Sequence, residues 1–158
     1  MPQFCFESIN WSPYFGEQGA SIPILVDAAR DAGFEWISFD EKLLANAVET
    51  GVSLGEVRDL VSEAGLQVLA IHSLAISNDR DTDLALAGPL IEAASALGAA
   101  YLHCGVRSDL DASVRASAKS VAQLARSADV AIAIEFLPFL PVASIATTRD
   151  LVSACEDE

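Results

Sequence analysis

The sequence predicts an α/β protein in which parallel β-strands alternate with α-helices. A unit of helix, glycine and strand recurs around Gly33, Gly65 and Gly98, and these glycines are 32 and 33 residues apart. This spacing matches one βα unit of about 30 residues. The second observation is the run of Val, Ala and Ile over residues 130–134, which leads directly into Glu135. Such a run is typical of a strand buried on both faces of a parallel sheet.

Two N-terminal helices are predicted from the residues that begin them. Ser21 is expected to cap a helix over residues 21–32, in which a proline is tolerated in the first turn. Ser53 and Glu56 have the spacing of a capping box, so a helix is expected to open there and to run to Ala64.

Three further helices are predicted in the second half of the chain. In a helix over residues 83–97, the Gly88-Pro89 pair is expected to cause a kink or a split. Leu, Val and Ala at helical spacing predict a helix over residues 112–127, and Ser144 is expected to cap a last helix. A weaker fourth copy of the repeated unit, in which the glycine is missing, starts at Ser127. Between the helices, the expected strands cover residues 3–9, 34–39, 66–71, 99–103 and 130–138.

Alternating elements of this kind close either as an open doubly wound sheet or as a (βα)₈ barrel. The loop after the first strand, residues 10–16, contains no Gly-x-Gly-x-x-Gly pattern, so dinucleotide binding is not supported. No phosphate loop of the Gly-x-x-x-x-Gly-Lys type occurs either.

Charge and composition restrict the function further. The net charge of −14 argues against a nucleic-acid surface, which needs a basic stripe, and gives an anionic membrane nothing to bind. No apolar run approaches the ~20 residues that span a bilayer. Cys5, Cys104 and Cys155 are scattered and odd in number, which is typical of a reduced cytosolic protein. We therefore expect a cytoplasmic protein of one domain.

Protonatable side chains lie at or near the carboxyl ends of all five expected strands, where both folds bind their ligands. Both histidines of the chain are among them. These residue types suit a divalent cation or proton transfer. The residues are Glu7, Asp40 with Glu41, His72, His103 and Glu135.

Each of these residues also has a plainer interpretation. Glu7, Asp40 and Glu41 fit exposed loop positions, and either histidine fits a hydrogen-bonded core residue. Glu135 fits a cation ligand, but also a buried carboxylate that pairs with an arginine or caps a helix. In the first loop, three aromatic side chains either form an apolar wall over a ligand or fill the core: Trp11, Tyr14 and Phe15.

Four motifs occur in order along the chain: GFEWI at 33–37, GLQVLAIHS at 65–73, ALGAAYLHCG at 96–105 and IAIEFLP at 132–138. Together they resemble the xylose isomerase-like TIM barrels. This superfamily of sugar phosphate isomerases and epimerases also contains inosose dehydratases and endonuclease IV-type enzymes. Each motif alone is loose, whereas the ordered set is specific for the superfamily and says little about the substrate.

The resemblance implies metal-assisted proton transfer next to a carbonyl group on a sugar or polyol. Glu135 matches a glutamate that binds a divalent metal (Mn²⁺, Mg²⁺, Co²⁺ or Zn²⁺), and His72 matches a histidine that lines the substrate pocket. We expect His72 and Glu135 to be catalytic. The residues expected to contact the substrate are Glu7, Trp11, Asp40, His72 and His103.

The remaining metal ligands of the family come from later strands, beginning with an Asp-x-x-His motif that has no match in this chain. We therefore expect a single partial TIM-barrel domain over residues 1–158, with about five of eight βα units, an end within the fifth helix and an incomplete metal site. Two alternatives stay open: an inert half-barrel that binds or assembles, for example as a homo-oligomer through its exposed sheet edges, and a lyase like the inosose dehydratases. An Asp-x-x-His segment encoded downstream would favour the enzyme.

Overall fold

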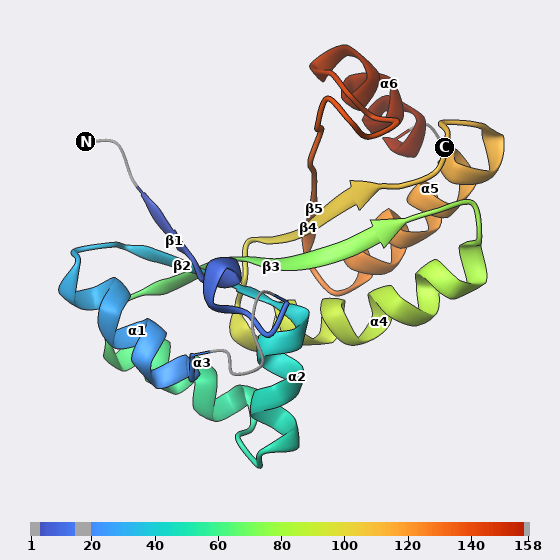
Figure 1. Cartoon of the computed structure of the whole chain (residues 1–158). Coiled ribbons are helices and arrows are strands. Elements are labelled where there is room, and N and C mark those ends of the chain that lie inside the picture. The colour runs from blue at the N-terminus through green and yellow to red at the C-terminus, as the bar shows by residue number, and fades with distance from the viewer. Residues whose placement is uncertain (1–3, 15–19, 157–158) are drawn as a thin grey trace. The chain divides into compact units, whose positions relative to one another are not determined.

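The computed structural model of the chain describes residues 4–14 and 20–156, in which five parallel strands alternate with helices (Figure 1). The strands follow one another in the sheet in chain order, β1-β2-β3-β4-β5. A doubly wound sheet reverses its strand order at a switch point, so this order identifies part of a barrel. The strands are β1 (Cys5–Glu7), β2 (Trp36–Asp40), β3 (Gln67–Ile76), β4 (Tyr101–Val106) and β5 (Ala131–Ile134).

Most of the helices lie where the sequence predicts them, and α5 agrees in both bounds. Two elements, α2 and the short 3₁₀ helix η1, are not predicted by the sequence pattern, because each begins directly after a strand without a separate loop. The predicted split at Pro89 is wrong, since α4 continues through this residue. The helical segments are η1 (Ser8–Trp11), α1 (Ile22–Asp31), α2 (Glu41–Glu49), α3 (Leu54–Glu63), α4 (Arg80–Leu97), α5 (Ala112–Ser127) and α6 (Ile145–Glu156).

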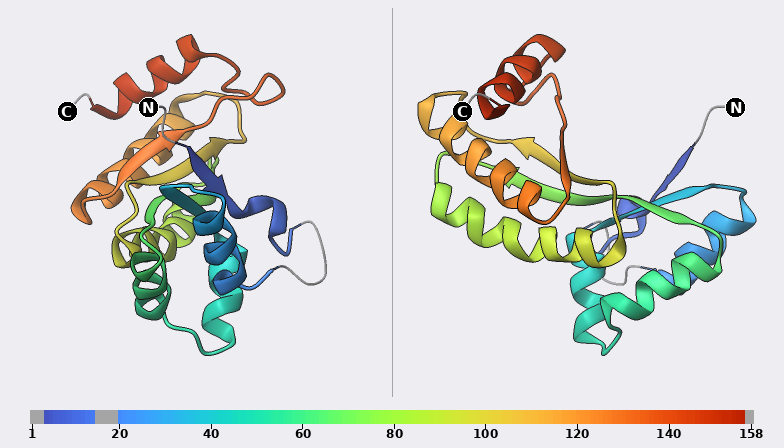
Figure 2. Two further views of the ribbon diagram at one scale, coloured as in Figure 1. Left: turned by 90° about the vertical axis from the view of Figure 1, so that its left-hand side faces the viewer. Right: turned by 180° about the vertical axis from the view of Figure 1, so that it is seen from behind.

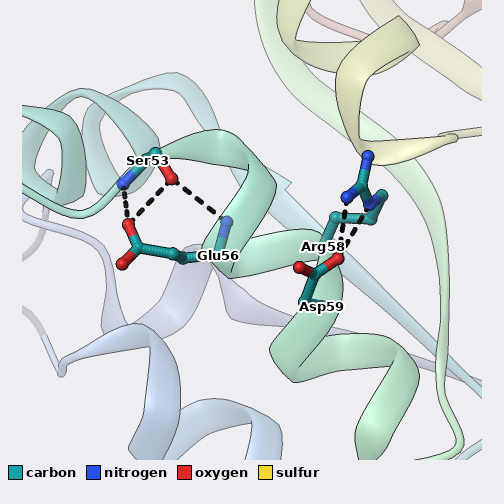
Figure 3. Close-up of polar contacts among 4 residues, drawn as sticks. All are labelled: Ser53, Glu56, Arg58 and Asp59. Atoms are coloured by element: carbon teal, nitrogen blue, oxygen red, sulfur yellow. Dashed lines mark hydrogen bonds and ion pairs between the residues drawn. The ribbon is translucent and has the colours of Figure 1, made fainter.

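The predicted helix starts differ in how they are capped. The capping box of α3 is confirmed, because the Ser53 N–H donates to Glu56 Oε2 at 2.7 Å and the Glu56 N–H donates to Ser53 Oγ at 3.2 Å (Figure 3). Ser144 Oγ likewise accepts the N–H of Thr147 at the start of α6. Ser21 stands at the N-cap position of α1, but its side chain makes no capping hydrogen bond.

The chain divides into two compact units, which we describe separately. The first contains residues 1–72 and 93–100, and the second contains residues 73–92 and 101–158. In the first unit, α1 packs against α3 and against β2. Its core contains Leu25, Val26, Ile37, Phe39, Val57 and Ile71.

In the second unit, α5 packs against β5 and α6, and α4 and α5 lie along one side of β4 (Figure 2). The carboxylate of Asp83 in α4 is buried and joins α4 to α5 and to the loop that follows β3. It accepts the N–H and the hydroxyl of Ser77, at 2.7 and 2.9 Å, and the hydroxyl of Ser117 in α5. The core contains Leu102, Cys104, Val106, Val121 and Leu151.

Five helices, α1 to α5, end in the same left-handed turn. One or two residues after the helix, φ is positive at Gly33, Gly51, Gly65 and Gly98, between 66° and 92°, and at Asp129, where φ is 58°. At Gly65 the N–H donates to the carbonyl oxygen of Ser62, and the next N–H donates to that of Val61. The other four turns repeat these two bonds, which define the Schellman motif. The weaker copy of the repeat that starts at Ser127 is therefore the same structural unit, with Asp129 in the left-handed position.

This turn can be tested with two glycines that differ only in backbone conformation. A methyl group added at Gly65 or at Gly88, inside α4, meets no neighbouring atom within 4 Å, but φ is positive only at Gly65. We expect Gly65→Ala to lower the free energy of unfolding by about 1–2 kcal/mol. Gly88→Ala should raise it by about 0.5–1 kcal/mol. Urea denaturation measures both.

Asp129→Gly provides the reciprocal test and is expected to stabilise the protein, because glycine adopts the left-handed conformation without strain. Equal effects of alanine at Gly65 and Gly88 would contradict the conformational explanation.

Candidate functional site

The predicted site residues fall into two groups, one in each unit. Glu7, Asp40 and His72 belong to the first unit, whereas His103 and Glu135 belong to the second. Within each unit, the strand register shows which side chains share a face of the sheet.

In the first unit, the structure brings together Glu7 and His72. Glu7 ends β1, and its Oε2 atom lies 3.0 Å from Nε2 of His72 in β3. The side chain of His72 is 15% exposed and that of Glu7 is 42% exposed, so the pair is open to solvent mainly on the glutamate side. Since the two residues come from separate strands, the sequence alone could not show this contact.

The predicted end of strand three at Ile71 is wrong, because β3 continues to Ile76. The extension is stabilised by β4, since the N–H of Arg107 donates to the carbonyl oxygen of Ile76 at 2.9 Å. His72 is therefore an internal residue of β3, although it pairs in register with Asp40 at the end of β2. The next residue, Ser73, has a φ of 98°, a strained conformation of the kind that clusters at functional sites.

Glu7 is held by its neighbours on β1 and β2. Ser38 pairs in register with Glu7 and is fully buried, and its Oγ lies 3.1 Å from Sγ of Cys5. Burial raises the pKa of Glu7. The polar contact with His72, the charge of His72 when protonated, and hydrogen bonds from Cys5 and Ser38 lower it by more, so the net pKa lies below the ordinary 4.5. Glu7 is thus a carboxylate at neutral pH.

Asp40 has a structural role that its position at a strand end did not reveal. It is fully buried, which excludes an exposed loop position. Its Oδ1 atom accepts the backbone N–H groups of Lys42 and Leu43, both at 3.1 Å, and thereby caps α2. The same oxygen accepts the hydroxyl of Ser12 at 2.8 Å, so it also anchors the first loop. Substrate contact by Asp40 stays a prediction.

The aromatic residues of the first loop form surface contacts around this group. Trp11 is 46% exposed and stacks on Phe6, with 5.2 Å between the ring centroids. The hydroxyl of Tyr14 donates to the carboxylate of Glu41. Phe15 lies outside the described residues. Trp11 therefore covers Phe6 and still presents part of its ring to solvent, which is compatible with the predicted wall over a ligand.

In the second unit, His103 and Glu135 share one face of the β4–β5 pair. His103 pairs in register with Ala133, and Glu135 stands two residues further along the same chain. The N–H of Glu135 donates to the carbonyl oxygen of Cys104 at 2.8 Å, so Glu135 extends the ladder beyond β5. The expectation that β5 is buried on both faces is wrong: Ala131 is exposed and the remaining residues are half-buried. Only contacts with β4 and α5 cover this strand extensively among the described elements.

The three cysteines are free thiols, as their spacing predicts. Burial raises the pKa of Cys104 to about 12 and, with the neighbouring Glu7 charge, that of Cys5 to about 11. Burial also raises the pKa of Cys155. All three therefore stay protonated at neutral pH, and nucleophilic thiolate chemistry is not supported.

The donor side chains in residues 4–14 and 20–156 do not gather around one point. No three His, Cys, Asp or Glu side chains in these ranges converge closely enough to hold a metal ion. The described part of the chain therefore does not form a complete metal site by itself. In the same ranges, no helix is both long enough and apolar enough to cross a membrane.

Comparison with known proteins agrees with this geometry. The family model of the xylose isomerase-like TIM barrel matches residues 26–158. No curated protein matches the sequence. Among solved structures, a xylose isomerase domain containing protein from Salmonella typhimurium superimposes with a TM-score of 0.82 at 17% identity. The match covers 98% of this chain and 57% of the other.

Two further structures show the same relation. The IolI protein, with a bound zinc atom, has a TM-score of 0.76 at 15% identity, and the match covers 99% of this chain and 60% of that one. The probable 3-DHS dehydratase AsbF from Bacillus anthracis has a TM-score of 0.77 at 12% identity, with the same coverage of 99% and 60%. The chain thus spans about 60% of the length of these structures, and the likeness shows the fold.

The pair of Glu7 and His72 predicts a specific dependence of stability on pH. Because the folded pKa of Glu7 lies below 4.5, its carboxylate stabilises the fold above pH 4.5, and this contribution is lost as the pH falls through the folded pKa. We expect Glu7→Gln to lower the free energy of unfolding most at neutral pH. The difference from wild type should disappear in acid, as measured by urea denaturation across pH.

Glu63→Gln is the matched control, because Glu63 is an exposed glutamate near the end of α3. A constant difference between wild type and Glu7→Gln from neutral to acidic pH would contradict the role of the Glu7 charge.

Proposed function

The chain belongs to the xylose isomerase-like TIM barrel family, and on this basis we propose that it acts in proton transfer next to a carbonyl group, as a sugar or polyol isomerase or epimerase. The family contains isomerases and dehydratases, such as the IolI and AsbF proteins described above. The observation that carries the proposal is the contact between Glu7 and His72 at the ligand-binding edge of the sheet.

His72 is proposed as the group that moves the proton. Isomerisation beside a carbonyl needs a base that removes a proton from carbon and returns it to the neighbouring atom. An imidazole suits this task, because it exchanges protons near neutral pH. The half-buried position of His72 beside an ionised carboxylate keeps it accessible and oriented. Glu7, Trp11 and Asp40 are proposed to contact the substrate in the first unit, and His103 in the second.

Glu135 is proposed as a metal ligand and as the second catalytic residue. Its carboxylate oxygens suit Mn²⁺, Mg²⁺, Co²⁺ or Zn²⁺, and the IolI protein of the same fold binds zinc. When bound, such an ion polarises a carbonyl or hydroxyl oxygen. Since the described residues do not complete a metal site, no step of this proposal passes through the metal.

Two alternatives keep specific support. A dehydratase begins with the same proton removal and then expels a hydroxyl group, and AsbF carries that activity in its name. An assembly module would use β1 and β5, which stand at the two ends of the strand order. Edge strands present unpaired N–H and C=O groups that bind further strands. Such a module is therefore expected to form a homo-oligomer through these strands. The proposed setting is cytoplasmic, without nucleic acid or membrane partners.

Deuterium exchange tests the proton transfer directly. The chain is incubated in D₂O with Mn²⁺ and a panel of ketoses and aldoses, and deuterium at the carbon beside the carbonyl is followed by NMR. We expect exchange in the wild type and a loss on the order of 10²–10⁴-fold in His72→Asn. Glu63→Gln should exchange as the wild type does. Full exchange in His72→Asn would contradict the role of His72, and no exchange with any sugar would favour the assembly module.

Thermal melts with Mn²⁺ test the metal site separately. An ion that binds only the folded chain, at 100 times its dissociation constant, adds about 2.7 kcal/mol. At roughly 2–4 °C per kcal/mol for a domain of this size, the melting temperature should rise by about 5–10 °C. Glu135→Gln should abolish this rise, whereas Glu92→Gln on the exposed side of α4 should retain it. An equal rise in the melting temperature of Glu135→Gln would show that the ion binds elsewhere. Sedimentation of the same samples shows whether the chain forms a homo-oligomer.

A further inference from the structure

We propose that Phe139, on the turn that follows β5, is a binding residue that packs against the C–H face of a sugar or polyol at the ends of β4 and β5. The identity of this ligand rests on the proposed function, which the inference deepens by assigning the apolar side of the site. In the second unit, that function names only two polar residues, His103 and Glu135. Small-molecule sites are lined mainly by apolar and aromatic side chains, with few polar groups.

The turn that carries Phe139 is closed by backbone hydrogen bonds. The N–H of Leu140 donates to the carbonyl oxygen of Leu137 at 2.9 Å. This bond spans a four-residue β-turn with Pro138 in its second position, where proline supplies the required φ. At the base of the turn, the N–H of Leu137 donates to the carbonyl oxygen of Val142 at 3.3 Å, and Val142 is fully buried. The turn is therefore an ordered element, anchored at its base.

This turn lies over the face of β4 that carries His103. Alternate residues of β4 are fully buried, and His103 and Gly105 stand between them, so these two residues share the opposite face. A methyl group added at Gly105 would lie 3.9 Å from Cδ1 of Leu140. Leu140 therefore packs over this face at the end of β4. Since Glu135 stands on the same face of the β4–β5 pair, the turn borders both polar residues.

Phe139 occupies the tip of the turn and is left uncovered by the described residues. Its side chain is 80% exposed, which is the highest exposed fraction among the large hydrophobic side chains in residues 4–14 and 20–156. Phe136, directly after Glu135, is 42% exposed. A ring on a turn that is already ordered gives a ligand apolar contact without the entropic cost of fixing a loop.

The chemistry of sugars and polyols fits this arrangement. Their hydroxyl groups need hydrogen-bond partners, and the carboxylate of Glu135 offers acceptors. Their C–H groups form apolar patches that an aromatic ring covers. A phenyl ring has no hydrogen-bonding group, so Phe139 supplies contact area and shape. We therefore expect it to strengthen binding of the substrate and of the transition state equally, which leaves the rate of proton transfer unchanged.

Phe139→Trp converts the proposed contact into a fluorescence signal. The indole stands at an exposed position, so its emission should have the long wavelength of an indole in water. The ketoses and aldoses of the exchange panel are added in the presence of Mn²⁺. At least one of them should shift the emission to shorter wavelength, and the shift should saturate. The wild type, which contains Trp11 and Trp36, supplies the background spectrum.

Phe139→Ala measures how much the ring contributes. Calorimetric titration with the sugar that gives the largest shift should show affinity lower by a factor on the order of 3–10. In the exchange assay, KM should rise by the same factor while kcat stays at the wild-type value. Ile145→Ala is the matched control, because Ile145 is 70% exposed at the start of α6 in the same unit. It should bind as the wild type does, and circular dichroism establishes that the variants are folded.

Three results would overturn the proposal. They are the absence of an emission shift with every sugar of the panel, wild-type affinity in Phe139→Ala, and an equal loss of affinity in Ile145→Ala. The outcome is separable from that of the proposed function. An emission shift without deuterium exchange would support the contact and contradict the enzyme. Exchange in the wild type with an unchanged KM in Phe139→Ala would support the enzyme and overturn the contact.

Discussion

The left-handed turn that joins a helix to the next strand is the constraint on which the rest of the structure depends. At Gly33, Gly65, Gly98 and Asp129 the chain ends its helix within two residues and satisfies the last carbonyl groups with two hydrogen bonds. The following strand begins almost at once, so each helix returns the chain to the same edge of the sheet. Repetition of this turn places the strands side by side in chain order, with their carboxyl ends on one edge. A candidate site at that edge follows from the turn.

The same edge concentrates carboxylates in a chain that is already strongly acidic. The structure keeps them apart by giving each a different partner. Asp40 caps α2, Glu7 faces His72, and Glu41 accepts the hydroxyl of Tyr14. Without such partners, like charges at neighbouring strand ends would repel one another and raise the cost of folding. The positive φ of Ser73, directly after His72, shows that the backbone is also held in a strained form at this point.

The two units contribute different chemistry. The first unit holds a histidine beside a carboxylate, which suits proton transfer. The second holds His103 and Glu135 on one sheet face, which suits a cation but provides fewer ligands than a site needs. The chain belongs to the xylose isomerase-like TIM barrel family and spans about 60% of the length of the similar structures.

Local signals in the sequence determined the fold class and most of the elements. Helix caps, glycine turns and hydrophobic spacing depend on residues within four or five positions of one another, so the capping box at Ser53 and both bounds of α5 could be predicted. The ordered motifs also identified the family. Glu7 and Asp40 lie at the carboxyl ends of β1 and β2 as predicted, whereas the predicted strand ends at His72 and His103 are wrong, because these residues lie inside β3 and β4. The contacts of these side chains could not be predicted.

Only the tertiary structure decided how those residues are used. The contact between Glu7 and His72 depends on the register of three strands, and the burial of Asp40 depends on a helix that begins without a loop. The half-exposed state of β5 depends on which elements cover it, whereas its apolar composition indicated a strand buried on both faces. Strand register and the burial of a strand by neighbouring elements are set by segments far apart in the chain. Local sequence preferences carry no information about either of them.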